Sequence, residues 1–155
     1  VAAGIVAYRK AQMAYQRPYS GITHTLMRLR EQGLRLVVVT DAPRLKAWMR
    51  LTELGLQDFF DSVVAFEDTG ERKPSTLPFA KALDRLCLRS SEVVMVGDWP
   101  ERDVAGAHKL GITAVWARYG WQLAKPEPRK HGADFVIDKP EEILLVVRKL
   151  HSAKP

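Results

Sequence analysis

One segment, Leu34–Thr40, most constrains what this chain can fold into, because it is apolar and rich in β-branched residues. A short run of this kind, without alternation of polar and apolar residues, predicts a β-strand that is buried on both faces. Similar runs follow along the chain, and helical patterns separate them. The predicted strands are Leu34–Thr40, Ser62–Phe66, Glu92–Val96, Thr113–Trp116 and Asp134–Ile137. Strands that alternate with helices predict an α/β fold with a parallel sheet.

Apolar residues at helical spacing predict the helices between these strands. The predicted helices cover Val1–Gln16 and Ile22–Glu31, and others begin after Asp41, at Ser75 or Thr76, near Asp103 and at Pro140. Right-handed crossovers would place helices on both faces of the sheet and the carboxyl ends of the strands along one edge. In open α/β sheets ligands bind at that edge, so polar residues that follow the strands are the candidate site residues.

The most detailed prediction concerns the ends and the buried face of the helix after Asp41. Asp41 is expected to cap this helix, and Pro43 to lie in its first turn. Four apolar residues at helical spacing predict its buried face. They are Leu45, Trp48, Leu51 and Leu54. Gly55 is expected to end the helix.

Composition excludes several classes of function. The 155 residues suffice for one domain with a substantial core, and no apolar run approaches the roughly eighteen residues of a membrane span. The net charge is +6, but the basic residues are scattered and match no nucleic-acid module, so we expect neither a nucleic-acid nor a membrane partner. Cys87 is the single cysteine, which excludes an internal disulfide and suits a cytoplasmic protein.

Thr40 and Asp41 follow the first predicted strand. The Thr40 hydroxyl and the next backbone N–H groups can point at an anion, and the positive end of the following helix would assist. The alternative is that Thr40 and Asp41 only cap the helix. Lys73 lies in a loop before Pro74, where it can neutralise a phosphate oxygen, although most loop lysines are simply solvated.

Asp98 and Asp103 follow the third predicted strand, and Gly97 precedes them. A turn between the two residues can bring both carboxylates toward one point. Two carboxylates repel each other unless a cation lies between them, and oxygen ligands suit Mg²⁺. The alternative is that Asp103 only complements the helix dipole. We favour the metal interpretation, because a strand-terminal aspartate would otherwise be desolvated without compensation.

These residues together resemble the motifs of the haloacid dehalogenase-like hydrolases, and of the branch similar to phosphoglycolate phosphatases. Thr40 matches the family's second motif, Lys73 with Pro74 the third, and Asp98 with Asp103 the fourth. Further matching segments are Pro18–Gly21, Leu54–Leu56 and Phe59–Asp61. The resemblance covers Pro18 to about Leu150 and implies a Rossmann-like three-layer α/β/α sandwich.

The resemblance implies a Mg²⁺-dependent phosphatase that hydrolyses a small-molecule phosphate monoester through an aspartyl-phosphate. Thr40, Asp41 and Lys73 would bind the phosphoryl group, and Thr40 and Lys73 would also assist the chemistry. Asp98 and Asp103 would hold the magnesium ion. An alternative is a non-catalytic domain that keeps the phosphate and metal pocket for a regulatory or interaction role.

The family's first motif, an apolar strand that ends in Asp-x-Asp and supplies the nucleophile, has no counterpart here, since no Asp or Glu precedes Glu31. We therefore expect the chain to be an inactive fragment. Residues 1–17 would be the last helix of a helical cap, and residues 18–155 the core. The absent strand would lie centrally, between those that end at Thr40 and Asp98. We expect the chain alone to be poorly stable, or to close the gap by pairing these strands or by self-association.

Overall fold

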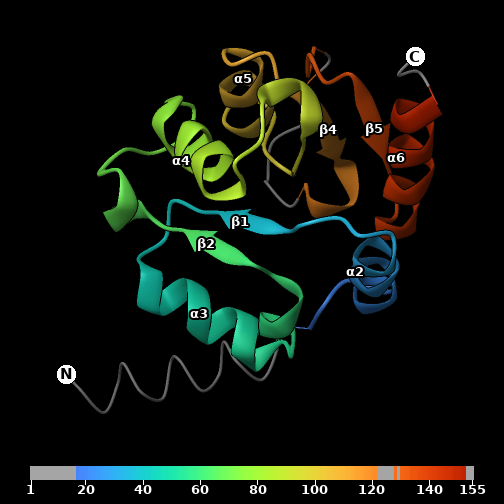
Figure 1. The fold of residues 1–155 in the computed structure, drawn as a ribbon, viewed down its shortest axis with the longest axis horizontal. Helices are drawn as coiled ribbons and strands as arrows, with labels where there is room; N and C mark the ends of the chain where they lie inside the picture. Colours follow the sequence, from blue (N-terminus) through green and yellow to red (C-terminus); the bar gives the residue numbers. More distant parts are fainter. Residues whose placement is uncertain (1–16, 122–127, 129, 153–155) are drawn as a thin grey trace.

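Two separate parallel sheets form the centre of the computed structural model (Figure 1). The smaller sheet contains β1 (Val37–Val39) and β2 (Ser62–Val64). The larger sheet has the order β3-β4-β5, formed by Val94–Gly97, Thr113–Ala117 and Phe135–Ile137. The structure describes residues 17–121, 128 and 130–152, so the predicted cap helix within residues 1–17 lies almost entirely outside the described residues.

All pairings are parallel, which confirms the predicted fold class. Val38 lies opposite Val63 in the smaller sheet, and Val96 lies opposite Val115 in the larger one. The strands are shorter than predicted at several ends. In particular, only Val37–Val39 of the predicted strand 34–40 belongs to β1.

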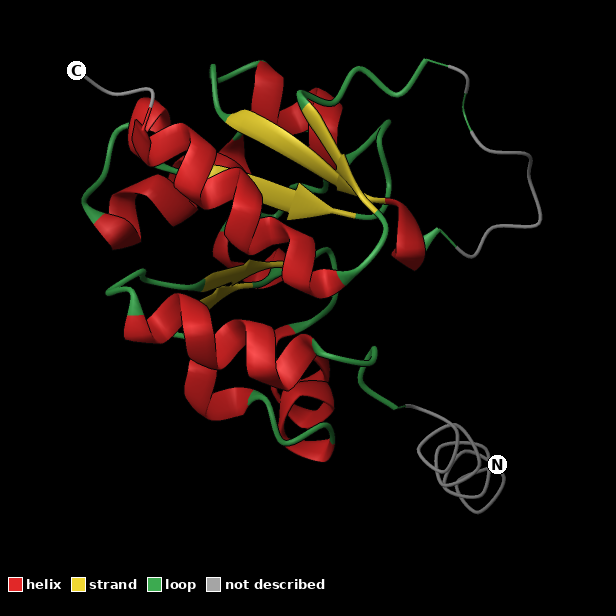
Figure 2. Ribbon diagram, turned by 90° about the vertical axis from the view of Figure 1, so that its right-hand side faces the viewer, coloured by secondary structure: helices red, strands yellow, loops and turns green. Residues whose placement is uncertain are grey.

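Helices cover the sheets on both faces (Figure 2). They are α2 (Ile22–Glu31), α3 (Arg44–Glu53), α4 (Leu77–Leu86), α5 (Asp103–His108) and α6 (Ile143–Ser152). Short 3₁₀ helices lie at Gln57–Phe59, Phe66–Asp68, Ser90–Glu92, Arg118–Gly120 and Pro140–Glu142. Within the described part of the chain, no helix is long and apolar enough to cross a membrane.

The two faces of β4 belong to different halves of the core, because side chains alternate along a strand. Val115 and Ala117 join a cluster with residues of α2, β5 and α6, whereas Ala114 and Trp116 join a cluster with residues of α4 and α5. Val115 is fully buried and Trp116 is 2% exposed. This strand therefore forms the hydrophobic centre of the larger sheet.

The expectations for α3 were partly wrong. Pro43, not Asp41, occupies the N-cap position, because the Asp41 carboxylate bonds elsewhere. Ala47 is the buried residue of the helix, whereas Leu45 is 73% exposed and Trp48 is also exposed. The helix packs on β2, and of the predicted apolar stripe only Leu51 and Leu54 are half-buried.

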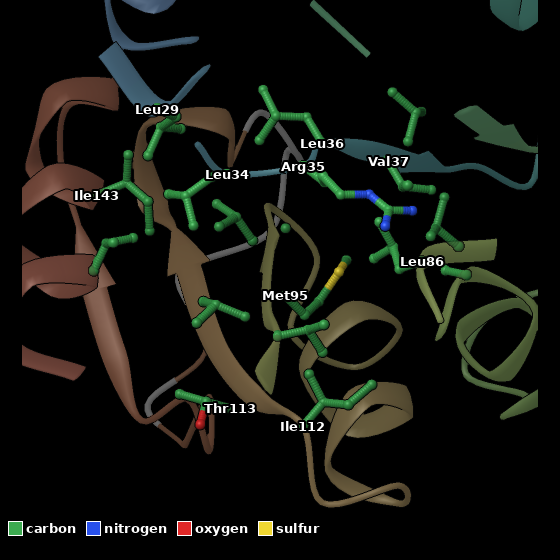
Figure 3. A pocket seen from close by; sticks show the side chains of 18 of the residues that line it. Leu29, Leu34, Arg35, Leu36, Val37, Leu86, Met95, Ile112, Thr113 and Ile143 are labelled. Carbon is green, nitrogen blue, oxygen red and sulfur yellow. The ribbon is translucent and has the colours of Figure 1, made fainter. Parts of the chain in front are cut away.

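β1 and β3 are not paired with each other. Of the three alternatives that we expected for the gap, pairing of these two strands is therefore wrong, whereas low stability and self-association stay predictions. A cavity of about 770 Å³ lies between them instead. Residues of α2, α4 and α6 line this cavity together with β1 and β3 (Figure 3).

Asp68 connects three elements around the smaller sheet. Its Oδ2 accepts a hydrogen bond from the Ala65 N–H at 2.7 Å, and its Oδ1 accepts from Arg44 at 2.6 Å and from Arg85. Arg85 also donates to the Val63 carbonyl at 2.6 Å. Desolvation alone would raise the pKa of Asp68, but the bonds from Ala65 and Arg44 and the charge of Arg85 lower it below 3.8. The carboxylate thus stabilises the folded state.

We expect Asp68→Asn to lower the free energy of unfolding by about 3 kcal/mol at neutral pH, because two arginines lose their charged partner. The folded-state pKa of Asp68 lies below the unfolded value, so its contribution is present above pH 3.8 and is lost as pH falls through the folded value. Urea unfolding between pH 7 and pH 3 tests this, with Asp84→Asn on the exposed face of α4 as control. A difference between the wild type and Asp68→Asn that does not shrink in acid would contradict the assignment.

Candidate functional site

The predicted residues come together at the carboxyl ends of β1 and β3, a place that we call the rim. Lys73 lies at its centre. Its Nζ donates to the Val39 carbonyl at 3.1 Å and to Asp103 Oδ1 at 2.6 Å. Val39 directly precedes Thr40, and Asp103 begins α5 just after β3. One ammonium group therefore joins the ends of two strands that belong to different sheets.

Two contacts of Asp41 hold the Lys73 loop in place. The Lys73 backbone N–H donates to Asp41 Oδ1 at 2.9 Å, and Asp41 Oδ2 pairs with Arg102 at 3.3 Å. The Arg102 guanidinium also lies 4.1 Å from the ring centre of Trp99. An ionised carboxylate only accepts hydrogen bonds, so Asp41 could bind an anion only through its backbone N–H.

Asp103 is the buried carboxylate of the site, and the residue is 3% exposed. Its Oδ2 accepts from the Trp99 N–H at 3.0 Å, while its Oδ1 receives Lys73. A Cβ atom on Gly97 would lie 2.4 Å from the Asp103 side chain. Glycine at the end of β3 therefore makes room for this carboxylate, which explains the Gly-Asp pair that the sequence shows.

Asp98 lies beside Asp103 and is exposed as a residue at the rim. Protein atoms that displace water from its carboxyl group raise its pKa, and the negative charge of Asp103 raises it further. Its backbone carbonyl accepts from Trp116 Nε1 at 3.2 Å, and a Cβ on Gly120 would lie 2.6 Å from the Asp98 Cβ. Two residues of the β4 end thus fix the position of Asp98.

The chemistry of this pair fits part of a magnesium site. The two neighbouring carboxylates supply the hard oxygen ligands that Mg²⁺ prefers, and their mutual repulsion favours a cation between them. Among the described residues, no group of three or more His, Cys, Asp or Glu side chains could hold a metal ion. Asp98 and Asp103 could therefore hold the ion only together with ligands from elsewhere, such as water or substrate.

Thr40 has a more local role than expected. Its Oγ1 accepts a hydrogen bond from the Ala42 N–H at 3.1 Å, in a turn that leads into α3. The hydroxyl hydrogen can still donate to an anion, because this bond uses the oxygen as acceptor. The start of α3 is less suited to an anion than predicted, since the Arg44 N–H donates to the Glu67 carboxylate at 2.9 Å.

Sequence reasoning missed the residues that position the site from other elements. Gly120 and the Val39 carbonyl were not among the candidates. A glycine and a tryptophan near strand ends carry no distinctive signal in a single sequence, so only the folded chain reveals their contacts with Asp98.

The motifs and the fold agree with what comparison with known proteins shows. Residues 4–117 match the family model of the haloacid dehalogenase-like hydrolases. The chain therefore belongs to this family.

Characterised relatives are phosphatases. The chain is 41% identical over 151 residues to the glyceraldehyde 3-phosphate phosphatase of Methanopyrus kandleri, a match that covers 97% of this chain and 65% of that protein. It is 31% identical over 125 residues to the phosphoglycolate phosphatase of Xanthomonas campestris, which covers 81% of this chain and 56% of the relative. A crystal structure of a phosphatase from Thermococcus onnurineus has a TM-score of 0.72 and 32% identity, and covers 83% of this chain and 57% of that one. The chain thus spans less than two thirds of the length of these relatives.

We expect Lys73→Met to lower the free energy of unfolding by about 3 kcal/mol, because it leaves the buried Asp103 carboxylate without its cation. The double variant Lys73→Met/Asp103→Asn should lose at least about 1 kcal/mol less than the sum of the losses of Lys73→Met and Asp103→Asn, since the two charges depend on each other. Urea unfolding of all three variants measures this coupling.

Lys81→Met is the matched control, because Lys81 lies on the exposed face of α4. Its effect should stay within about 0.5 kcal/mol. If the double variant loses the sum of the two single losses in free energy of unfolding, Lys73 and Asp103 do not form an energetically coupled pair.

Proposed function

We propose that this chain is the larger part of the catalytic core of a cytoplasmic, Mg²⁺-dependent phosphatase that hydrolyses a small-molecule phosphate monoester. The nucleophilic aspartate, which would form the aspartyl-phosphate, comes from polypeptide outside the 155 residues. The observation that carries the proposal is the bond of Lys73 to both the Val39 carbonyl and Asp103, since it gathers the motif residues at one rim.

Each motif residue has a distinct role in this proposal. The Thr40 hydroxyl and the Asp41 N–H donate to the oxygens of the transferring phosphoryl group. Lys73 neutralises the charge that builds up on the phosphoryl oxygens and orients the attacking carboxylate. Asp98 and Asp103 hold the magnesium ion, which, when bound, supplies electrostatic stabilisation of the negatively charged transition state.

The substrate class follows from the relatives rather than from the rim itself. Relatives named glyceraldehyde 3-phosphate phosphatase and phosphoglycolate phosphatase act on small phosphorylated metabolites, as their names state. The rim also carries a second cation, Arg102. Its guanidinium and the Lys73 backbone N–H both bond the Asp41 carboxylate. Glyceraldehyde 3-phosphate is therefore the first substrate to test after the general reagent p-nitrophenyl phosphate.

We expect hydrolysis of p-nitrophenyl phosphate in the presence of Mg²⁺ only by a protein extended upstream of Val1, because the 155 residues contain no counterpart of the nucleophilic aspartate. The measurement compares the chain and the extended protein, with and without EDTA. In the extended protein, Asp98→Asn should lower kcat by about 100-fold or more, because it removes a ligand of the ion.

Asp84→Asn serves as the control in the same protein, and its activity should equal that of the wild type. Absence of turnover in both lengths of protein, together with phosphate or Mg²⁺ binding detected by calorimetry, would instead support a non-catalytic binding domain. Full activity of the 155-residue chain would contradict the assignment of the nucleophile.

A further inference from the structure

A carboxylate lies beside the groups that are assigned to the phosphoryl group. Asp41 follows Thr40 directly, and its side chain is only 18% exposed. The Asp41 N–H would donate to a phosphate oxygen, but the ionised side chain of the same residue carries a negative charge. Like charges repel each other most strongly where water is partly excluded. An Asp41 carboxylate without a compensating cation would therefore oppose the binding of a phosphate at the rim.

Arg102 supplies this compensating charge from a different element. Its Nη1 lies 3.3 Å from Asp41 Oδ2. Arg102 directly precedes α5, which follows β3, whereas Asp41 follows β1, so the pair forms only in the folded chain. A guanidinium stays protonated at any pH used for proteins. The positive charge beside Asp41 is therefore permanent.

Trp99 holds the Arg102 side chain in this position. The guanidinium carbon lies 4.1 Å from the centre of the Trp99 ring, which is a cation–π distance. Trp99 is fixed in turn, because its backbone N–H donates to Asp103 Oδ2 at 3.0 Å. Exposed ion pairs contribute little because two free side chains must be ordered. Arg102 is already ordered by the ring, so its pairing with Asp41 has a smaller entropic cost.

The charge of Asp41 and its hydrogen bond to the Lys73 loop are separable. Oδ1 of Asp41 accepts the Lys73 backbone N–H at 2.9 Å, and the side-chain oxygen of an asparagine could accept the same bond. Only the negative charge requires Arg102. Substitution of Asp41 by asparagine therefore removes the charge but keeps an acceptor for the loop.

We propose that Arg102 is a positioning residue that sets the phosphate affinity of the rim by cancelling the charge of Asp41. The inference rests on the proposed function, which assigns the phosphate to this rim. Lys73 cannot replace Arg102 in this role, because its ammonium bonds the Val39 carbonyl and Asp103. The competing explanation is that Arg102 binds the phosphate directly. In that case Arg102 would be needed whether or not residue 41 is charged.

The test measures the Kd of inorganic phosphate by calorimetry, in the protein extended upstream of Val1. Arg102→Met keeps an apolar side chain over Trp99 but leaves Asp41 uncompensated, so it should raise the Kd by about tenfold. Asp41→Asn leaves Arg102 as an additional positive charge and should lower the Kd by about threefold. The double variant Asp41→Asn/Arg102→Met should bind phosphate within about twofold of the wild type, since neither charge is left alone.

Two further variants separate charge from general damage. Arg102→Lys keeps the charge and should leave the Kd within about threefold of the wild type. Arg28→Met breaks an ion pair of 2.8 Å with Glu31 on α2, in which both side chains are about half exposed. It should not change the Kd. Added salt should reduce the effect of Arg102→Met, because ions screen the repulsion between Asp41 and phosphate.

A double variant that binds as weakly as Arg102→Met would overturn the inference and indicate direct contact with phosphate. An Asp41→Asn variant that binds less tightly than the wild type would also overturn it, and this variant tests the inference even if Arg102→Met does not fold. So would a wild-type protein that does not bind phosphate.

Turnover of p-nitrophenyl phosphate is a separate measurement. Arg102→Met should raise KM by about tenfold and change kcat by less than about threefold, because the charge of Asp41 opposes binding of the phosphate before any chemical step. Phosphate binding that follows the expected order of variants, without turnover in the wild type, would contradict the phosphatase proposal and leave the role of Arg102 intact.

Discussion

The bond network of Lys73 is the interaction on which the rest of the site depends. The two sheets share no backbone ladder, and this ammonium bonds a carbonyl at the end of β1 and the buried carboxylate that follows β3. Its own backbone is held in turn by Asp41. The Lys73 ammonium, which is assigned to phosphate chemistry, therefore also connects the two halves of the core. Such a charge is retained at a partly buried position only because its partners satisfy it on several sides.

The order and type of the elements could be predicted from the sequence, because each depends on local patterns. The apolar run around Val38 and the glycine that follows α2 act within a few residues, and the structure confirms both. The meeting of Lys73 with Asp103 was also predictable, since parallel strands end at one edge of a sheet. A strand, a loop lysine and a Gly-Asp pair thus sufficed to locate the rim.

What the sequence could not predict depends on long-range packing. The side of α3 that is buried could not be read from its own pattern, since Ala47 is its buried residue and Leu45 is exposed despite its place in an apolar stripe. The Asp41 carboxylate had two possible partners, the local helix end and the distant Lys73 loop, and the distant one prevailed. The support that Gly120 gives to Asp98 arises from a contact between two loops, which no spacing rule describes.

The cavity and the carboxyl ends of β1 and β3 are connected through the same two strands. The Val39 carbonyl at the end of β1 accepts a hydrogen bond from Lys73, and β1 and β3 both line the cavity. The separation of these strands sets the distance between Thr40, which follows β1, and Asp103, which follows β3. Packing of the residues that line the cavity and the geometry of the site are for this reason coupled.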